Sequence, residues 1–369
     1  MKEKLRTLKK KIQPLFKMQQ IKTIAVCAAQ VPFRSGGAEE HVNSLIRELK
    51  KRGYQVQLIN IPFKWYPHSQ LFNSIKIWEL LDLTESDGQK IDLVISTKFP
   101  SYFIRHPNKV LWLIHQYRQA YDLLNTPYSG FNLQSPDQKK IWEDFVSRDT
   151  AALKGYKRIY TNAKNTSKRL KKFNKTNSTA LYHPPKNYKK FYTAGYEDFI
   201  LSAGRLDQLK RVELLIKALK YTDKKLRCKI AGSGPYQAEL IKMAKRFKVY
   251  DRIEFLGYVS DQELLDLYAR CAFVFFSPLD EDYGYITLEA FLSKKPVITA
   301  FDSGGPLEFV EDNSSGIILQ ELNEEYIAKK LEELFYDREK CRRMGEYGYK
   351  KICKINWDQV IDTLIGEQR

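Results

Sequence analysis

The chain has 369 residues, of which 43% are hydrophobic, and its 62 Lys and Arg against 44 Asp and Glu give a net charge of +18. This length favours two domains, because a single hydrophobic core rarely extends beyond about 250–300 residues. The five cysteines show no CxxC spacing, which argues against a zinc site and favours a reduced, cytoplasmic setting. No apolar run approaches the roughly 20 residues of a transmembrane helix, and the first twenty residues lack the apolar centre of a secretory signal.

The positive charge predicts attraction to an anionic partner, such as nucleic acid, an acidic membrane surface or a phosphorylated substrate. From Thr150 to Lys190 there are twelve Lys and Arg but no Asp or Glu. The first twenty residues are also basic and place several apolar side chains near one helical face, although Pro14 would interrupt a helix. This segment is either a helix lying on anionic lipid, at the inner membrane face, or a solvated tail, and the sequence leaves both open.

The first half of the chain alternates apolar strands with helices. A strand at 21–27 precedes a Gly-containing loop and a helix that runs from about Ala38 to Gly53, where glycine is a common terminator. Further strands are expected at 54–61, 91–96, 109–114 and 158–161, with a basic helix at 164–173. This alternation predicts a parallel sheet with covering helices.

A proline-containing segment, Tyr182 to Lys190, breaks this alternation and is predicted to link the domains. We therefore expect a first domain over 1–190, a second over 191–350, and a final helical segment over 351–369 that returns to the first. In the second domain, strands are expected at 199–203, 229–231, 253–256, 273–276 and 297–300. Helices are expected at 212–219, 236–247, 261–271 and 286–292, and over most of 323–365. The predicted fold class is α/β, with two Rossmann-like halves.

Glu281 and Glu289 lie eight residues apart, the first after the strand at 273–276 and the second about one turn into the next helix. Ligands bind at this edge of an open α/β sheet. Two carboxylates there can hold hydroxyl pairs while a helix N-terminus faces an anion, and a nucleotide sugar offers both groups. The alternative is that Asp280, Glu281 and Asp282 only cap the helix and complement its dipole.

Other motifs also follow predicted strands. The glycines of Ser35-Gly36-Gly37 would let backbone N–H groups approach an oxyanion, although such a pair is also ordinary turn chemistry. Arg205 and Lys210 are placed where a guanidinium and an ammonium would neutralise a diphosphate leaving group, with surface solvation as the alternative. His115 ends the strand at 109–114 and is either a structural or a functional histidine. No GxGxxG, Walker loop or paired-His metal motif is present.

In combination, Glu281-x7-Glu289, the GR-x4-K run from Gly204 to Lys210, the GSGP turn and the SGGAE loop resemble the retaining family-4 glycosyltransferases of the GT-B fold, also called glycosyl transferases group 1. The resemblance extends from about Ile21 to Trp357 and is more specific in the second half. It implies an enzyme that moves a hexose-type sugar from a UDP- or GDP-sugar to a glycan or lipid-linked acceptor, with retention of configuration. No metal or cofactor is implied, and the setting would be polysaccharide or glycoconjugate synthesis.

The resemblance also implies residue roles. Glu281 would bind hydroxyls of the donor sugar and Glu289 those of the ribose, while Arg205 and Lys210 would grip the diphosphate. His115 would lie near the donor sugar and the acceptor. The remaining donor contacts implied are Gly36, Gly37, Gly204, Gly232, Asp282, Tyr283, Gly284 and Tyr285, with Val259 beside the base.

Two positions depart from the family pattern. Arg211 stands where glycine is common, and it either adds phosphate binding or covers the helix. Lys294-Lys295 replaces a small residue before Pro296, which is expected to be a surface change.

Two other functions compete with glycosyl transfer. A nucleotide-sugar epimerase or hydrolase could share this architecture. A basic nucleic-acid-binding protein would explain the charge, but it needs exposed aromatics among its cations, whereas Tyr156, Tyr160 and Phe173 are predicted to be core. No nucleic-acid partner is therefore expected.

Overall fold

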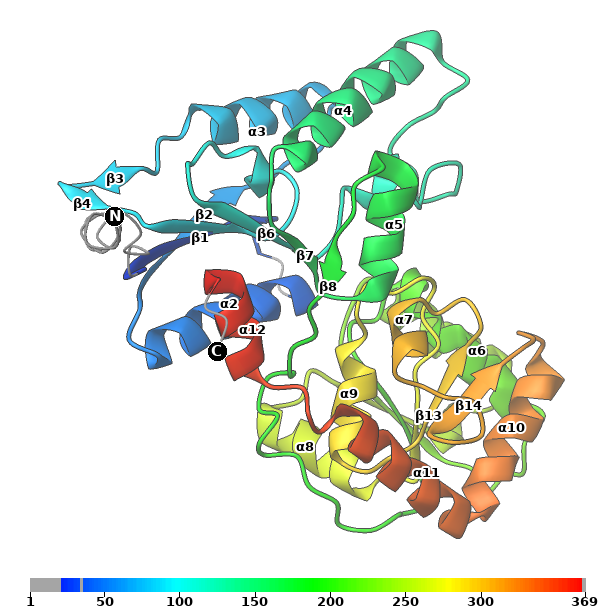
Figure 1. Ribbon diagram of the computed structural model, residues 1–369. Helices are drawn as coiled ribbons and strands as arrows, with labels where there is room; N and C mark the ends of the chain where they lie inside the picture. The colour runs from blue at the N-terminus through cyan, green and yellow to red at the C-terminus, as the bar shows by residue number, and fades with distance from the viewer. Residues whose placement is uncertain (1–20, 34–35, 367–369) are drawn as a thin grey trace, which may run out of the picture.

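The computed structural model of the 369-residue chain describes residues 21–33 and 36–366. The basic segment over the first twenty residues and Ser35, both discussed above, lie outside these ranges. The described chain forms two six-stranded sheets, each covered by helices on both faces (Figure 1). All strand pairs within the two sheets are parallel. The predicted α/β class with two Rossmann-like halves is confirmed.

The first sheet has the strand order β2-β1-β5-β6-β7-β8. Its strands are β1 (Thr23–Gln30), β2 (Gln55–Pro62), β5 (Leu93–Ser96), β6 (Lys109–Leu113), β7 (Ile159–Thr161) and β8 (Thr179–Ala180). Its helices are α2 (Gly37–Lys51), α3 (Ser69–Leu80), α4 (Pro136–Lys154) and α5 (Lys164–Asn174). The chain also forms a small hairpin of β3 (Glu85–Ser86) and β4 (Gln89–Lys90). The order reverses between β1 and β5, which is where ligands bind in such sheets.

The second sheet has the order β11-β10-β9-β12-β13-β14 and reverses between β9 and β12. Its strands are β9 (Ile200–Ala203), β10 (Cys228–Ala231), β11 (Ile253–Gly257), β12 (Phe273–Phe275), β13 (Val297–Ala300) and β14 (Gly316–Leu319). Its helices are α6 (Val212–Leu219), α7 (Gln237–Arg246), α8 (Asp261–Arg270), α9 (Tyr285–Leu292), α10 (Glu324–Tyr336) and α11 (Arg338–Ile352). Ser260 caps α8, and Glu263 completes a capping box.

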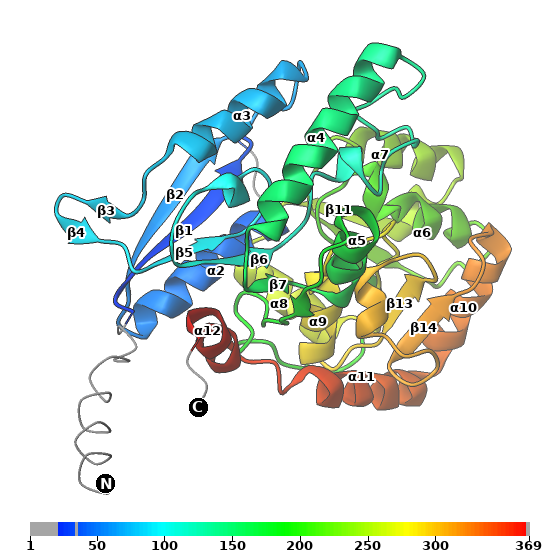
Figure 2. The ribbon, with the colours of Figure 1, turned by 45° about the horizontal axis from the view of Figure 1, so that its top comes forward.

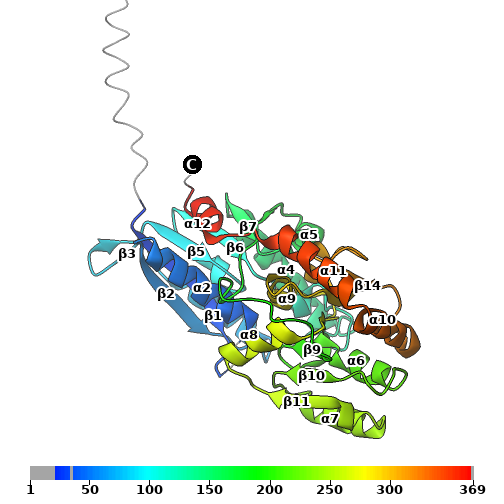
Figure 3. The same cartoon turned by 90° about the horizontal axis from the view of Figure 1, so that it is seen from below.

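Alternating side chains of β1 build two cores. Ile24 and Val26 face α2, whereas Ala25 and Cys27 face α3 and α4. The last helix, α12 (Trp357–Ile365), joins the first of these cores and lies beside α2, as Figure 2 shows. The prediction that the C-terminal helix returns to the first half is therefore confirmed, and Figure 3 shows the crossing from below.

A histidine-aromatic junction ties the two halves together. The His183 ring lies 4.4 Å from the ring of His41 and 5.0 Å from that of Trp112, and it is 5.4 Å from Tyr285 on α9. His183 Nε2 also bonds the Tyr285 hydroxyl. His183 belongs to the segment predicted as a linker, which contains no helix or strand. The segment is nevertheless tightly packed, because His183 is fully buried.

Lys295 corrects one sequence prediction. It is not a surface residue: its side chain is fully buried, its Nζ donates to the carbonyl oxygen of Gly195, and it lies 3.8 Å from the ring centroid of Tyr196. Burial lowers the pKa of Lys295 to about 8. Lys294 has a left-handed backbone with φ of 54°, a conformation that glycine adopts without strain. The backbone geometry explains why a small residue suits this turn.

Candidate active site

A cleft of about 720 Å³ opens between the two halves, at the carboxyl ends of β1, β6, β9 and β12. This volume lies in the range of small-molecule sites. Most residues singled out from the sequence line it, although they are dispersed along the chain. They are Gly36, Gly37, His115, Gly204, Arg205, Lys210, Glu281, Asp282, Tyr283, Gly284, Tyr285 and Glu289.

Gly232 and Val259 do not line this cleft. A Cβ atom on Gly232 would lie 1.9 Å from the carbonyl oxygen of Gly204, so this glycine permits the close approach of the backbones that follow β9 and β10. Val259 is half-buried and packs against an apolar cluster that includes Phe276 and Tyr283. Packing explains both positions, and the contacts of Gly232 and Val259 with the donor stay a prediction.

Lys210 and Glu281 form an ion pair in the cleft, with Lys210 Nζ donating to Glu281 Oε2. The contact joins the turn after β9 to the loop after β12. Arg205, at the mouth, is half exposed and donates twice to Asp207 Oδ2, at 2.9 and 2.8 Å. Both cations that line the cleft are thus held at the sheet edge by carboxylates.

Glu289 lies on α9, one turn after its start, as expected. The hydroxyl of Tyr268 donates to Glu289 Oε2 at 2.7 Å and fixes the carboxylate. Burial, together with the nearby carboxylates of Glu40 and Asp261, raises the pKa of Glu289 to about 7, although the hydrogen bond from Tyr268 opposes this shift. Tyr268 was not singled out from the sequence, because a Tyr on the apolar stripe of α8 is indistinguishable from core.

His115 follows β6 and is held neutral. Its Nδ1 donates to the carbonyl oxygen of Gln116 at 2.7 Å, which leaves Nε2 to accept a hydrogen bond. Burial lowers the pKa of His115, although Asp282 opposes this effect. A neutral imidazole in this cleft can accept a proton or a hydroxyl hydrogen bond.

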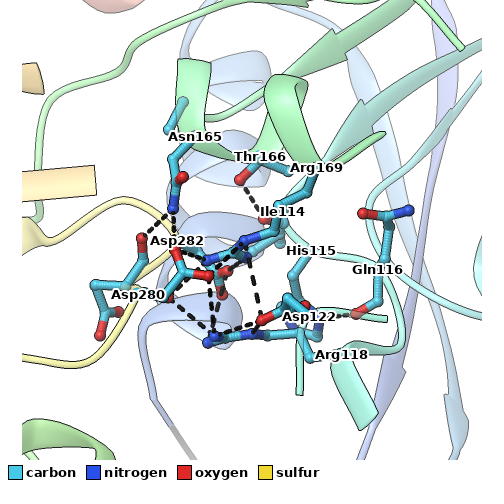
Figure 4. Close-up of polar contacts among 12 residues, drawn as sticks. Ile114, His115, Gln116, Arg118, Asp122, Asn165, Thr166, Arg169, Asp280 and Asp282 are labelled. Atoms are coloured by element: carbon cyan, nitrogen blue, oxygen red, sulfur yellow. Dashed lines mark hydrogen bonds and ion pairs between the residues drawn. The ribbon is translucent and has the colours of Figure 1, made fainter. Parts of the chain in front are cut away.

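Asp282 is engaged by two arginines of the first half, as Figure 4 shows. Burial alone would raise the pKa of Asp282, but Arg118 and Arg169 hold it well below its usual range. Neither arginine was identified from the sequence. Arg169 sits in the lysine-rich helix α5, which was predicted from the sequence only as a basic helix, and its partners Asp280 and Asp282 lie more than a hundred residues away.

The first half adds an aromatic wall to the cleft, made of Phe63, Trp65, Phe99 and Tyr117. Their rings contact one another at centroid distances of 5.5 to 6.2 Å. A surface of this kind offers apolar area to a partly apolar ligand. No local pattern indicates this wall, because the four residues come from three separate segments. Within residues 21–33 and 36–366, no group of three His, Cys, Asp or Glu side chains is arranged to hold a metal.

Arg211 supports the backbone that precedes the loop Asp280–Asp282. Its backbone is left-handed, with φ of 51°, which accounts for glycine being common here. Its guanidinium donates to Ser277 O and Pro278 O, both at 2.8 Å, and pairs with Asp302 at 2.6 Å. Arg211 does not line the cleft.

We expect Arg211→Ala to lower the free energy of unfolding by about 2 kcal/mol, because Asp302 and two carbonyl groups lose their donor. The affinity for UDP or GDP should not change. Urea unfolding and calorimetric titration measure the two quantities. Arg205→Ala is the matched control, with the opposite pattern expected. Equal losses of nucleotide affinity in both variants would show that Arg211 binds phosphate.

Comparison with known proteins agrees with this geometry. Residues 186–351 match the family Glycosyl transferases group 1. The chain is 31% identical over 187 residues to the GDP-mannose-dependent alpha-(1-6)-phosphatidylinositol monomannoside mannosyltransferase of Mycobacterium tuberculosis, which is 48% of each chain. It is 29% identical over 178 residues to an uncharacterized glycosyltransferase of Methanocaldococcus jannaschii, covering 47% of this chain and 49% of that protein. The matched stretch thus spans about half the length of these curated relatives.

Solved structures resemble the whole fold. Sucrose-phosphate synthase from Thermosynechococcus elongatus superposes with a TM-score of 0.74 at 16% identity, covering 93% of this chain and 100% of that one. Anabaena HepE, solved in complex with UDP and glucose, gives 0.67 at 16% identity, covering 93% and 99%. The fold is GT-B, and residues 186–351 of the second half match the glycosyl transferases group 1.

Proposed function

We propose that the protein is a retaining glycosyltransferase that moves a hexose-type sugar from a UDP- or GDP-sugar to a glycan or lipid-linked acceptor. The observation that carries this proposal is the arrangement of Lys210, Glu281 and Glu289 around one cleft. The helices α2 and α9 also begin at this cleft, at Gly37 and Tyr285, and neither start is capped by a side chain. Uncapped helix starts suit phosphate oxygens.

In this proposal each group of the donor has a separate site. Glu289 accepts hydrogen bonds from the ribose hydroxyls, and Glu281 accepts them from the sugar. Arg205, Lys210 and the helix starts hold the diphosphate and stabilise its charge as the bond from the sugar C1 to the phosphate oxygen breaks. The acceptor oxygen forms the new bond to C1 on the same face, and its proton passes to the departing phosphate. Arg205 and Lys210 thus supply the positive charge that a bound metal ion supplies in metal-dependent transferases.

The aromatic wall favours transfer over epimerisation or simple hydrolysis. Phe63 and Trp65 give the first half an apolar surface in the cleft that also holds Glu281. An epimerase needs no site for a second substrate, whereas a transferase must bind an acceptor beside the donor. Product analysis separates the reactions, because only transfer depends on an added acceptor.

A thermal-shift screen of UDP, GDP and their sugar derivatives tests the proposal. A binding nucleotide should raise the melting temperature, because a ligand that binds only the folded state stabilises it. One base should be preferred, and Lys210→Ala should weaken the effect. No stabilisation by any nucleoside diphosphate would overturn the proposal.

Donor binding should depend on pH through Glu289. Its carboxylate form accepts hydrogen bonds from two hydroxyls, but its pKa of about 7 in the unliganded protein leaves it largely protonated in acid. Below pH 7, the affinity for UDP or GDP should therefore fall by up to about tenfold per pH unit. Calorimetric titration between pH 5.5 and about 8 measures this. Glu289→Gln should bind UDP or GDP weakly, and its affinity should not depend on pH in this way. If the variant keeps the pH dependence of wild type, Glu289 is not the group that titrates.

The exposed lysines of α5 support docking on an anionic membrane surface, where a lipid-linked acceptor would lie. Lys164, Lys168, Lys171 and Lys172 are exposed. No helix within the described ranges is long and apolar enough to cross a membrane. We expect the protein to float with vesicles containing anionic lipid at low salt and to be released at high salt, because such attraction is screened. Equal flotation with neutral vesicles would contradict this.

A further inference from the structure

The loop Asp280–Asp282, which carries Glu281, has a strained backbone. Asp280 is left-handed, with φ of 44°, and such residues persist where their surroundings hold them in place. The N–H side of the loop is fixed within its own half. The amides of Asp280 and Glu281 donate to the carbonyl groups of Asp302 and Ser303, each at 2.9 Å.

The carbonyl side of the loop is fixed from the other half. Arg169 Nη2 donates to Asp280 O at 2.6 Å, and Arg118 Nη2 donates to the same oxygen at 2.9 Å. Asn165 Nδ2 donates to Glu281 O at 2.9 Å and to Asp280 Oδ1 at 2.8 Å. Figure 4 shows these side chains converging on the loop. Three side chains of the first half therefore donate hydrogen bonds to the carbonyl groups of Asp280 and Glu281.

Charge strengthens this attachment. Arg169 pairs with Asp280 at 2.9 Å and with Asp282, and only 7% of its side chain is exposed. Asp122 lies 2.7 Å from Arg118 and 3.9 Å from Arg169, which orients the two guanidinium groups. In a buried network of this kind, removing one cation leaves carboxylates uncompensated.

Helix α5 is itself anchored to the second half. The backbone amides of Lys164 and Asn165 donate to Glu308, at 2.9 and 2.6 Å, and the hydroxyl of Tyr182 donates to the same carboxylate at 2.6 Å. This contact holds the start of α5 one turn away from Arg169. The position of Arg169 therefore depends on the contact between the two halves.

We propose that Arg169, assisted by Arg118, is a positioning residue that sets the conformation of the Glu281 loop from the opposite half. The donor-sugar site is then complete only when the first half is docked, although its carboxylate belongs to the second. This inference rests on the proposed function, because it gives Glu281 its role toward the sugar. Nucleotide binding through Glu289 should not need Arg169.

Hydrogen exchange of the ligand-free protein tests the positioning. We compare wild type with Arg169→Gln, Arg169→Lys and Lys168→Gln, an exposed neighbour that loses the same charge. In Arg169→Gln, the amides of Asp280 and Glu281 should exchange about tenfold faster, while those of β9 and β12 remain unchanged. Arg169→Lys should be intermediate and Lys168→Gln should equal wild type. Unchanged exchange at the loop, or faster exchange throughout both halves, would overturn the proposal.

Titration with UDP, UDP-glucose, GDP and GDP-mannose supplies the second readout. Arg169→Gln should bind UDP or GDP with an affinity within about twofold of wild type. Its affinity for the corresponding sugar nucleotide, or its turnover of that donor, should fall about tenfold. Arg169→Lys should recover part of this loss, and equal losses for both ligands would overturn the role. If wild type binds none of the four, the proposed function fails, and the exchange result alone decides whether Arg169 fixes the loop. Arg169→Lys serves for both readouts if the glutamine variant does not fold.

Discussion

Lys210→Ala is expected to reduce glycosyl transfer about a hundredfold, because the leaving diphosphate loses a charged contact worth on the order of 3 kcal/mol. Lys210 meets Glu281 in the cleft, and the side chains of both remain about one-fifth exposed. The loss of this ion pair should therefore change the free energy of unfolding by less than about 1 kcal/mol. Initial rates with a bound donor and its acceptor, together with urea unfolding, measure the two effects.

Lys220→Ala, an exposed lysine just after α6, is the matched control and should transfer at the wild-type rate. A cost in catalysis without a cost in stability would place Lys210 at the leaving group. Wild-type turnover by Lys210→Ala would remove that assignment and leave Arg205 and the helix starts to hold the phosphates.

Lys295→Met is expected to raise the free energy of unfolding by about 2 kcal/mol at pH 7. Lys295 has a pKa of about 8 in the folded protein, below the value of 10.5 for a free lysine. Between pH 8 and about 10.5, Lys295 binds more protons in the unfolded chain than in the folded protein, so the stability of wild type rises with pH. Below pH 8 the full cost of the buried ammonium is present. The advantage of methionine should therefore shrink as the pH approaches about 10.

Thermal and urea unfolding between pH 6 and about 10 measure this dependence. Lys294→Met, the half-buried neighbour, removes the same charge and should leave the slope unchanged. If Lys295→Met is less stable than wild type at every pH, the bond to Gly195 and the contact with Tyr196 outweigh the cost of burying the charge.

Local patterns were sufficient to predict most of the architecture. Apolar strands such as β1 and β12 and glycine turns such as that at Gly204 are recognisable within ten residues, and parallel topology then brings their ends together. Helix α4 was missed because only Phe145, Asp149 and Leu153 are buried along its length, which leaves a weak apolar stripe. The short strand β14 was missed because four residues give no periodicity.

The candidate site was predicted where its chemistry follows a strand end, as for Glu281 and Lys210. It was missed where contacts join distant segments. Arg and Lys usually lie on the surface, and only the tertiary structure shows that Arg169 and Lys295 are buried. Arg211 could not be assigned from its type, because its left-handed backbone turns the side chain toward Asp302 rather than into the cleft.

The return of α12 to the first half has a consequence for synthesis on the ribosome. The face of the first sheet that includes Ile24 and Val26 is closed partly by Trp357, Val360 and Ile361, which are translated after the whole second half. Because N-terminal domains generally fold first, α2 can cover its share of this face, but the part that α12 covers stays exposed while about 160 further residues emerge. A nascent chain stalled before Trp357 should therefore expose apolar surface that a chaperone can bind, and release of the last helix completes the first core.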